Sequence, residues 1–188
     1  DYTMPENIAK EDAAAILAKY AREDGLLDGV KDKWNLVDWP QNLRDNYDFN
    51  LTNPIGEGIH NVMNAFYVGC VSQVEQIKDI LEIPYENKST ALKETFNKLF
   101  FNKETNLYVD SVGSKHSSLH ANVIPLYYGL EPDGTTNTIG NFIAEKGLVC
   151  GVYMAHMKQT AESVIYPEFT VIADIGEVSF DNSVVEIT

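Results

Sequence analysis

The feature that most constrains the fold of this chain is the recurrence of apolar residues at steps of three and four in separate segments. Such spacing places apolar side chains on one face of an α-helix. Six segments show it, at about 5–23, 57–81, 90–100, 116–130, 136–146 and 150–164. The sequence therefore predicts a mainly α protein in which successive helices pair as antiparallel hairpins through short loops.

The strongest pattern lies in residues 57–81. The apolar residues that we expect to face inward there are Ile59, Val62, Met63, Phe66, Cys70, Val74 and Ile77. In residues 116–130, Pro125 must kink the helix or begin a new turn, because proline lacks the backbone N–H that a helix interior uses. Between the third and fourth helices, residues 102–106 predict a turn and residues 107–111 a short extended piece.

The C-terminal residues change character. Two short β-prone runs flank Asp181, Asn182 and Ser183, which favours a hairpin. We therefore divide the chain into a helical portion, residues 1–164, and a β tail, residues 165–188, which is the start or a remnant of a β-sandwich.

The charge balance restricts the partners. The chain has 28 acidic and 14 basic residues, a net charge of −14, and no basic stripe. Such a surface repels phosphate, which argues against nucleic acid and anionic membranes but leaves neutral ligands such as sugars open. No apolar run reaches the eighteen or so residues of a membrane helix.

Two cysteines, Cys70 and Cys150, lie in apolar helical patterns, and buried free thiols are favoured over a disulfide. Neither a cofactor nor a metal site is expected. The oligomeric state stays open. For the compartment, the periplasm or the extracellular space is favoured over the cytoplasm.

The segment 33–49 combines aromatic and charged residues without helical or strand periodicity. Trp39 follows Asp38, and Arg44, Asp45 and Tyr47 come close behind. One interpretation is a sugar site, in which an indole face stacks on a pyranose while charged groups bind its hydroxyls. The other is an Asp–Arg clamp with buried tryptophans that holds the loop in place.

His116 and His120 lie four residues apart and would share a helix face. They form only half of a metal site, because the zinc-protease pattern needs a glutamate beside the first histidine and a serine stands there. We expect capping of this helix by Ser114 or Ser117, with the histidines facing solvent or lining the rim of a pocket.

Paired carboxylates are the only catalytic chemistry that the sequence offers. The candidates on loops are Asp38, Asp45, Asp48, Glu57 and Asp110. An inverting glycosidase needs one acid and one base, roughly 6.5–9.5 Å apart. Sequence alone does not give that distance.

Four stretches occur here in the order found in the α-L-rhamnosidase family. They are WNLVDWPQNLRDNYDF, GIHNVMNAFYVGC, HSSLHANVIPLYYGL and GLVCGVYMAH. The chain resembles a bacterial member over residues 15–157. The resemblance implies part of an (α/α)6 barrel of helical hairpins with flanking β-sandwich domains, and hydrolysis of terminal α-L-rhamnosides with inversion. It places the family's Asp-Trp motif on Asp38 and Trp39, in the wall of the sugar pocket.

The chain departs from this family in its length and in its catalytic groups. The family's general acid lies upstream of the Asp-Trp motif and its general base lies downstream of the last helix here, so the catalytic residues are expected largely outside this chain. Twelve helices with their loops need roughly 200–300 residues, which favours a fragment or a gapped chain. Serine is usual in the family where Gly151 stands, and glutamine where His156 stands.

Two functions follow from these observations. The leading one is part of a glycoside hydrolase, inactive on its own, that acts on rhamnose-containing oligosaccharides or glycosides. The alternative is a non-catalytic helical domain that binds carbohydrate or another partner. The predicted substrate-binding residues are Asp38, Trp39, Arg44, Asp45, Tyr47, His116 and His120.

Overall fold

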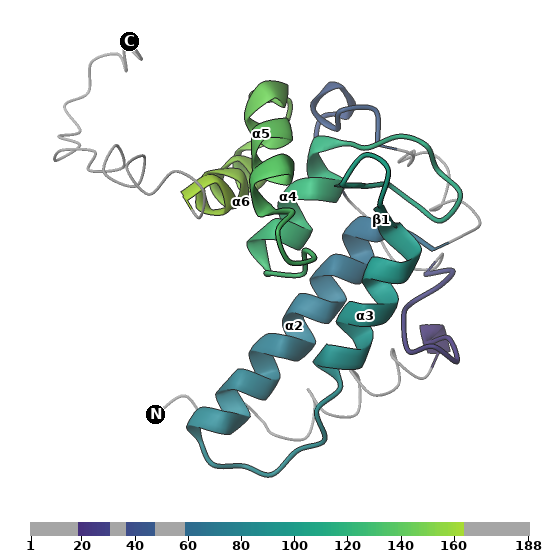
Figure 1. Ribbon diagram of the computed structural model, residues 1–188, viewed down its shortest axis with the longest axis vertical. Helices are drawn as coiled ribbons and strands as arrows, with labels where there is room; N and C mark the ends of the chain where they lie inside the picture. Colours follow the sequence, from purple (N-terminus) through teal and green to yellow (C-terminus); the bar gives the residue numbers. More distant parts are fainter. Residues whose placement is uncertain (1–18, 31–36, 48–58, 164–188) are drawn as a thin grey trace, which may run out of the picture.

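The computed structural model describes residues 19–30, 37–47 and 59–163 (Figure 1). Its elements are the 3-10 turn η1 (Gln41–Leu43), the helices α2 (Asn61–Ile80), α3 (Ser89–Phe100), α4 (Leu119–Tyr127), α5 (Thr136–Lys146) and α6 (Val152–Ser163), and the strands β1 (Phe101–Asn102) and β2 (Leu107–Tyr108). The predicted mainly helical fold is confirmed. The β tail, the boundary after residue 164 and most of the first predicted helix lie outside the described residues.

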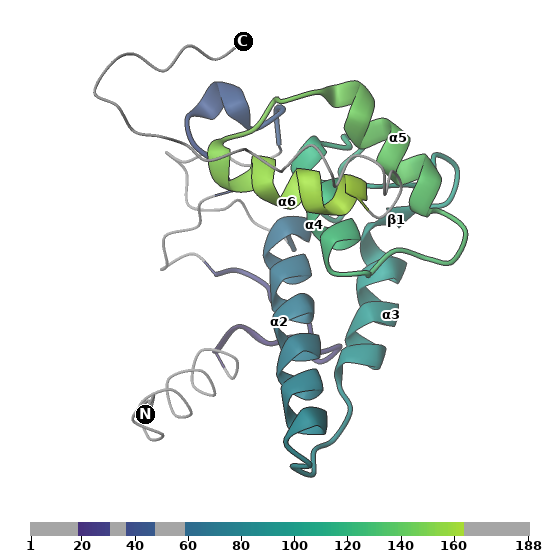
Figure 2. The same cartoon turned by 90° about the vertical axis from the view of Figure 1, so that its left-hand side faces the viewer.

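Helices α2 and α3 form an antiparallel hairpin, and they lie side by side in both views (Figures 1 and 2). Glu75 of α2 joins them at the start of α3. Its Oε1 accepts hydrogen bonds from the backbone N–H of Lys88 (2.7 Å) and of Ser89 (3.2 Å), and its Oε2 accepts one from the Ser89 hydroxyl. A carboxylate at this position satisfies N–H groups that the helix itself leaves unpaired, and it complements the helix dipole.

Helix α4 is the centre of the core, and it contacts α2, α5 and α6. Its residues Leu119, Ala121, Val123 and Ile124 are fully buried. A Cβ atom on Gly69 of α2 would lie 2.4 Å from the Tyr128 ring. Glycine at position 69 therefore lets α2 approach the end of α4 closely.

Pro125 lies inside α4, as the sequence predicts. Because proline has no backbone N–H, the carbonyl of Ala121 lacks its helical donor. The side chain of Asn61 supplies a replacement, since its Nδ2 donates to the Ala121 carbonyl at 3.2 Å and to the Val109 carbonyl at 3.0 Å. One buried amide thus satisfies the carbonyl that the proline leaves unpaired.

Two further asparagines attach irregular segments to helices. Asn64 of α2 accepts from the backbone N–H of Leu27 (2.8 Å) and donates to its carbonyl (3.0 Å). Asn122 of α4 does the same for Tyr108 of β2, at 2.9 and 3.1 Å. Each amide therefore pairs with an extended backbone as a neighbouring strand would. The β1–β2 hairpin held in this way confirms the extended piece predicted near residue 107.

The inward face predicted for residues 57–81 is wrong in its second half. Cys70, Val74 and Ile77 are exposed, and the buried residues of α2 are Asn61, Val62, Asn64, Ala65, Val68, Gly69 and Glu75. The reason is that the far end of α2 extends beyond α4, so that α3 decides which side is covered (Figure 1). Both cysteines are free, as predicted, but only Cys150 is buried.

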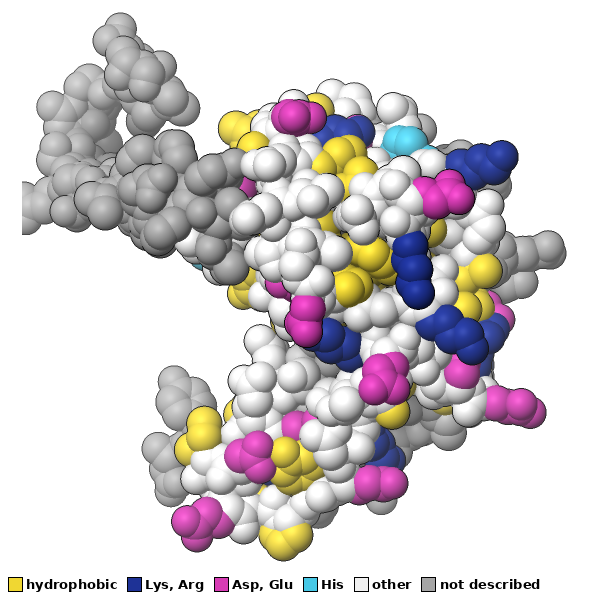
Figure 3. Space-filling view, viewed as in Figure 1, with side chains coloured by type: hydrophobic (Ala, Val, Ile, Leu, Met, Phe, Trp, Pro, Cys, Tyr) yellow, Lys and Arg dark blue, Asp and Glu magenta, His cyan; other side chains and the backbone are white. Residues whose placement is uncertain are grey.

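None of the described helices has the length and apolar character that crossing a membrane requires. On the face shown in Figure 3, carboxylates lie interspersed with lysines and arginines.

Candidate functional site

The loop 37–47 lies across the start of α4, the end of α5 and the start of α6, and two aspartates attach it there. Asp38 contacts α4 and the residue before α6, and Asp45 contacts α4 and α5. Figure 2 shows the loop beside the start of α6. The candidate residues from the two halves of the sequence are thus brought to one end of the helical core.

Asp38 is buried, and three donors surround its carboxylate. His120 Nε2 lies 2.8 Å from Oδ2, the backbone N–H of Gly151 donates to Oδ2 at 2.7 Å, and the backbone N–H of Trp39 donates to Oδ1 at 2.7 Å. Burial by itself raises the pKa of this carboxyl, but the three hydrogen bonds outweigh it and hold the pKa below its ordinary value. Asp38 is therefore an ionised anchor for the loop.

His120 is fully buried, and its Nε2 faces Asp38. A carboxylate only accepts hydrogen bonds, so the neutral imidazole carries its proton on Nε2. Its Nδ1 is buried without a hydrogen-bond partner among the described residues. A ligand in solvent cannot reach this ring, so the structure gives His120 a supporting role in place of the direct sugar contact that the sequence indicated.

Trp39 has a different environment from its neighbour. Its side chain is 64% exposed, although Asp38 beside it is buried. The backbone of Trp39 is held through Asp38, so the indole is presented to solvent from an anchored position. An exposed indole on a fixed backbone suits stacking on a flat apolar face.

Asp45 links two helices. Its Oδ2 accepts from the backbone N–H of Leu119, the first residue of α4, at 2.7 Å, and it forms an ion pair with Lys146, the last residue of α5, at 2.9 Å. Aspartate also tolerates the left-handed backbone found here, with φ of 47°. The cation paired with this carboxylate is therefore Lys146, where the sequence suggested Arg44.

Tyr47 and Arg44 are buried in the structure. The Tyr47 hydroxyl donates to the carbonyl of Asp110 at 2.7 Å and accepts from the backbone N–H of Val62 at 3.2 Å. Burial prevents either side chain from lining an open pocket. Their burial favours the interpretation in which residues of this segment hold the loop in place, and it does not support the direct sugar contacts predicted for Tyr47 and Arg44.

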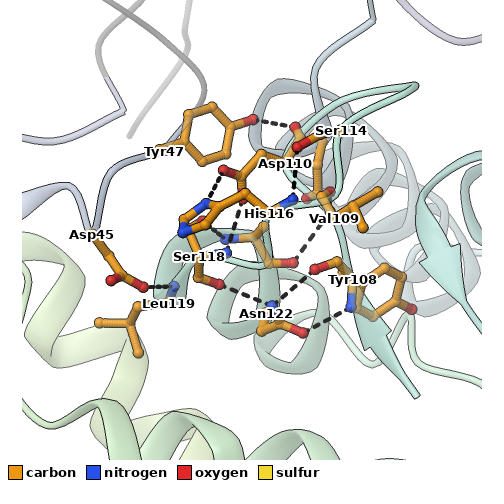
Figure 4. A network of polar contacts seen from close by, with 12 residues as sticks. Asp45, Tyr47, Tyr108, Val109, Asp110, Ser114, His116, Ser118, Leu119 and Asn122 are labelled. Atoms are coloured by element: carbon orange, nitrogen blue, oxygen red, sulfur yellow. Dashed lines mark hydrogen bonds and ion pairs between the residues drawn. The ribbon is translucent and has the colours of Figure 1, made fainter. Parts of the chain in front are cut away.

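Asp110 and His116 form a network at the start of α4 (Figure 4). Asp110 is fully buried, with Oδ2 2.7 Å from His116 Nδ1 and Oδ1 accepting from the backbone N–H of Ser118 at 2.9 Å. Ser118 caps α4, since its hydroxyl accepts from the backbone N–H of Ala121 at 3.1 Å. The predicted cap at Ser114 or Ser117 is therefore displaced to the next serine. The sequence offered Asp110 only as one loop carboxylate among several.

The described residues contain no group of three histidine, cysteine, aspartate or glutamate side chains that could hold a metal ion. His116 and His120 each face a different aspartate. The carboxylates of Asp48 and Glu57 lie outside the described residues.

A cleft of about 570 Å³ lies between α2, α3 and the turn after α4. Its lining includes Ser72, Gln76, Lys93, Glu94 and Tyr128. Eight helical positions separate Tyr128 from His120, a distance of about 12 Å along α4. The lining of the cleft contains none of the predicted site residues.

The fold and the loop 37–47 together define a mainly helical domain that carries an anchored, tryptophan-bearing loop at one end. Residues 12–146 match the sequence profile of the bacterial alpha-L-rhamnosidase 6 hairpin glycosidase domain. The match covers most of the chain, and the chain therefore belongs to this glycosidase family. No curated protein matches it.

Proposed function

We propose that this chain binds the terminal α-L-rhamnose of a glycoside or oligosaccharide, as part of a glycoside hydrolase that inverts configuration. The observation that carries the proposal is the exposed indole of Trp39 on a backbone anchored through Asp38. The family match supports a glycosidase, and the Asp-Trp pair lies within the matched residues.

The surroundings of Trp39 fit a neutral ligand better than an anion. The chain has a net charge of −14, and the residue before Trp39 is an ionised carboxylate. A neutral sugar avoids this repulsion and can still use the C–H face of its ring for stacking. Rhamnose suits such a platform because its methyl group adds apolar surface.

The catalytic pair is proposed to lie largely outside this chain. Inversion requires an acid that protonates the leaving oxygen and a base that activates water from the opposite side. Asp38 is a poor acid, since its hydrogen bonds favour the ionised form. Asp45 is occupied by Leu119 and Lys146. Both carboxylates are therefore engaged in holding the loop.

A non-catalytic carbohydrate-binding domain is the second candidate. It is favoured by the same observation, because the described carboxylates around Trp39 serve as anchors. The two candidates agree on binding and differ on turnover, so one set of variants tests both.

The binding test uses isothermal titration with methyl α-L-rhamnoside. Trp39→Ala should weaken binding about five- to 150-fold, if a sugar ring stacked on the indole contributes about as much as a nucleic-acid base stacked on an aromatic side chain, roughly 1–3 kcal/mol. Tyr153→Ala is the matched control, since Tyr153 is exposed to a similar degree (67%). Equal binding by both variants would remove the role proposed for Trp39.

The turnover test measures release of a chromogenic aglycone from an aryl α-L-rhamnoside. We expect none from these 188 residues alone. Release that is abolished by Asp38→Asn or Glu57→Gln would instead place the catalytic pair inside the chain. Binding of the rhamnoside without release of the aglycone fits both candidates. Release of the aglycone by a longer form of the protein would then favour the hydrolase.

A further inference from the structure

We propose that Asp110 and His116 form an oriented pair whose outward ring nitrogen, Nε2 of His116, accepts a hydrogen bond from a hydroxyl group of the ligand. Asp110 is the positioning residue, and His116 makes the contact. This inference deepens the proposed function, on which it rests, by assigning a polar contact at the site.

Asp110 is held from several directions and cannot follow the movements of the histidine. Its backbone carbonyl accepts from the N–H of Asn61 at 2.9 Å and from the Tyr47 hydroxyl at 2.7 Å. Its own N–H donates to the carbonyl of His116 at 3.0 Å, and its Oδ1 accepts from the N–H of Ser118 at 2.9 Å. The remaining oxygen, Oδ2, is thereby fixed in place for His116.

The position of Oδ2 decides the tautomer of His116. Oδ2 lies 2.7 Å from Nδ1, and an ionised carboxylate only accepts hydrogen bonds. The proton of the neutral ring therefore lies on Nδ1, and Nε2 has a free lone pair. The second nitrogen is then an acceptor.

Nε2 of His116 is available to a ligand. The side chain is 36% exposed, and the hydrogen bond that the ring forms with a described residue is made by Nδ1, not by Nε2. In Figure 4 this nitrogen points away from Asp110, on the side where Asp45 lies. His116 thus combines a fixed ring with an open acceptor.

His120 provides an internal comparison. Its Nε2, and not its Nδ1, faces an aspartate, so its tautomer is the opposite one, and the ring is fully buried. Two aspartates from different loops hold the two histidines in opposite tautomers. Of the two, only His116 has a partly exposed side chain.

The chemistry selects the ligand class. A neutral Nε2 acceptor needs a donor, which a sugar hydroxyl provides and a fully ionised carboxylate or phosphate does not. The carboxyl group of Asp110 behind the ring also disfavours an anion. A neutral polyhydroxylated ligand fits both conditions.

The first experiment reads the tautomer directly, by nitrogen-15 NMR of the histidine rings in the complete chain. We expect an unprotonated Nε2 on His116 and a protonated Nε2 on His120. Addition of methyl α-L-rhamnoside should shift the His116 Nε2 resonance and leave that of His120 unchanged. A protonated Nε2 in neutral His116 would overturn the proposal, and this measurement needs no substitution.

The second experiment converts Nε2 of His116 from a hydrogen-bond acceptor into a donor. In Asp110→Asn, the Ser118 N–H retains the amide oxygen and the amide NH₂ faces His116, so the ring proton moves to Nε2 and the acceptor becomes a donor. We expect the nitrogen spectrum to show this exchange and rhamnoside affinity to fall about two- to tenfold, the loss of one hydrogen bond. Val112→Ala, at an exposed neighbouring position, is the control and should change neither.

Failure of this inference can be told from failure of the proposed function. Rhamnoside binding that depends on Trp39 without any response at His116 overturns the inference alone. A response of His116 Nε2 to methyl β-D-glucoside but not to the rhamnoside supports the inference and overturns the rhamnose assignment. No response of Nε2 to either glycoside overturns the inference.

Discussion

Replacing Gly151 by alanine tests whether the loop 37–47 is held by the contact between Asp38 and the start of α6. A Cβ atom at position 151 would lie 2.3 Å from Asp38 Oδ1 and 3.0 Å from the Trp39 carbonyl. The backbone of Gly151 is not in the left-handed region, so the methyl group meets a lack of space and no backbone strain. We expect Asp38 to be displaced and the variant to be destabilised.

The magnitude follows from three contributions. Forcing a methyl group into a packed site costs about 1–3 kcal/mol. Displacement of Asp38 also weakens its charge-assisted hydrogen bonds with His120 and Gly151, worth about 1.5–3 kcal/mol each when fully lost. Alanine recovers about 0.4–1 kcal/mol by restricting the unfolded chain. The free energy of unfolding should therefore fall by about 1–3 kcal/mol, since the loop relaxes in part.

Urea unfolding followed by circular dichroism measures this loss, and Tm should fall by roughly 2–4 °C for each kcal/mol. Val152→Ala is the matched control, because the next side chain is 92% exposed and its loss should change the free energy by less than about 0.5 kcal/mol. In an Asp38→Ala background the carboxylate is gone, and Gly151→Ala should cost much less. Equal costs of Gly151→Ala in both backgrounds would refute the contact.

Three further outcomes are expected. Glu75→Gln should lower the free energy of unfolding by about 0.5–2 kcal/mol, since α3 loses a charged cap, whereas Glu94→Gln on the exposed face should not; urea unfolding measures both. Asn61→Ala should lower the free energy of unfolding by about 1–3 kcal/mol for each carbonyl left without its donor. Hydrogen exchange should then show faster opening of α4 around Ala121. Asp38 and Glu75 have pKa values in the folded state that lie below their ordinary values of 3.8 and 4.5. The stability that these two carboxylates contribute is therefore fully present above the ordinary values, and it is lost as the pH falls through the lowered, folded-state pKa values. Unfolding curves between pH 5 and 2 should show this loss, and Glu75→Gln should reduce its slope.

The sequence predicts the helices well because their signals are local. The segment 136–146 is α5 at both ends, and Pro125 lies inside α4 as expected. The wrong prediction that Cys70 and Ile77 face inward has a different origin. Spacing shows that apolar residues share a face, but only the neighbouring elements decide whether this face is covered, and α3 covers the opposite one.

The candidate site could be predicted only in part for a related reason. The pairing of Asp38 with Trp39 in one loop is visible in the sequence, and so is the spacing of His116 and His120. Which of these side chains is buried depends on contacts between distant segments. Asp38 and His120 are 82 positions apart, and nothing local indicates that one would bury the other.

The same distances have a consequence for how the protein acquires its structure. The partners that hold Asp38 and Asp45 come 82 and 113 residues later for the first, and 74 and 101 residues later for the second. Contacts of such long range form slowly, because a large loop must be closed before any of them stabilises the chain. During synthesis, the α2–α3 hairpin can form early from neighbouring residues. The set of contacts that holds the tryptophan-bearing loop is complete only once Gly151 has been synthesised, so we expect this loop to be among the last parts of the described structure to form.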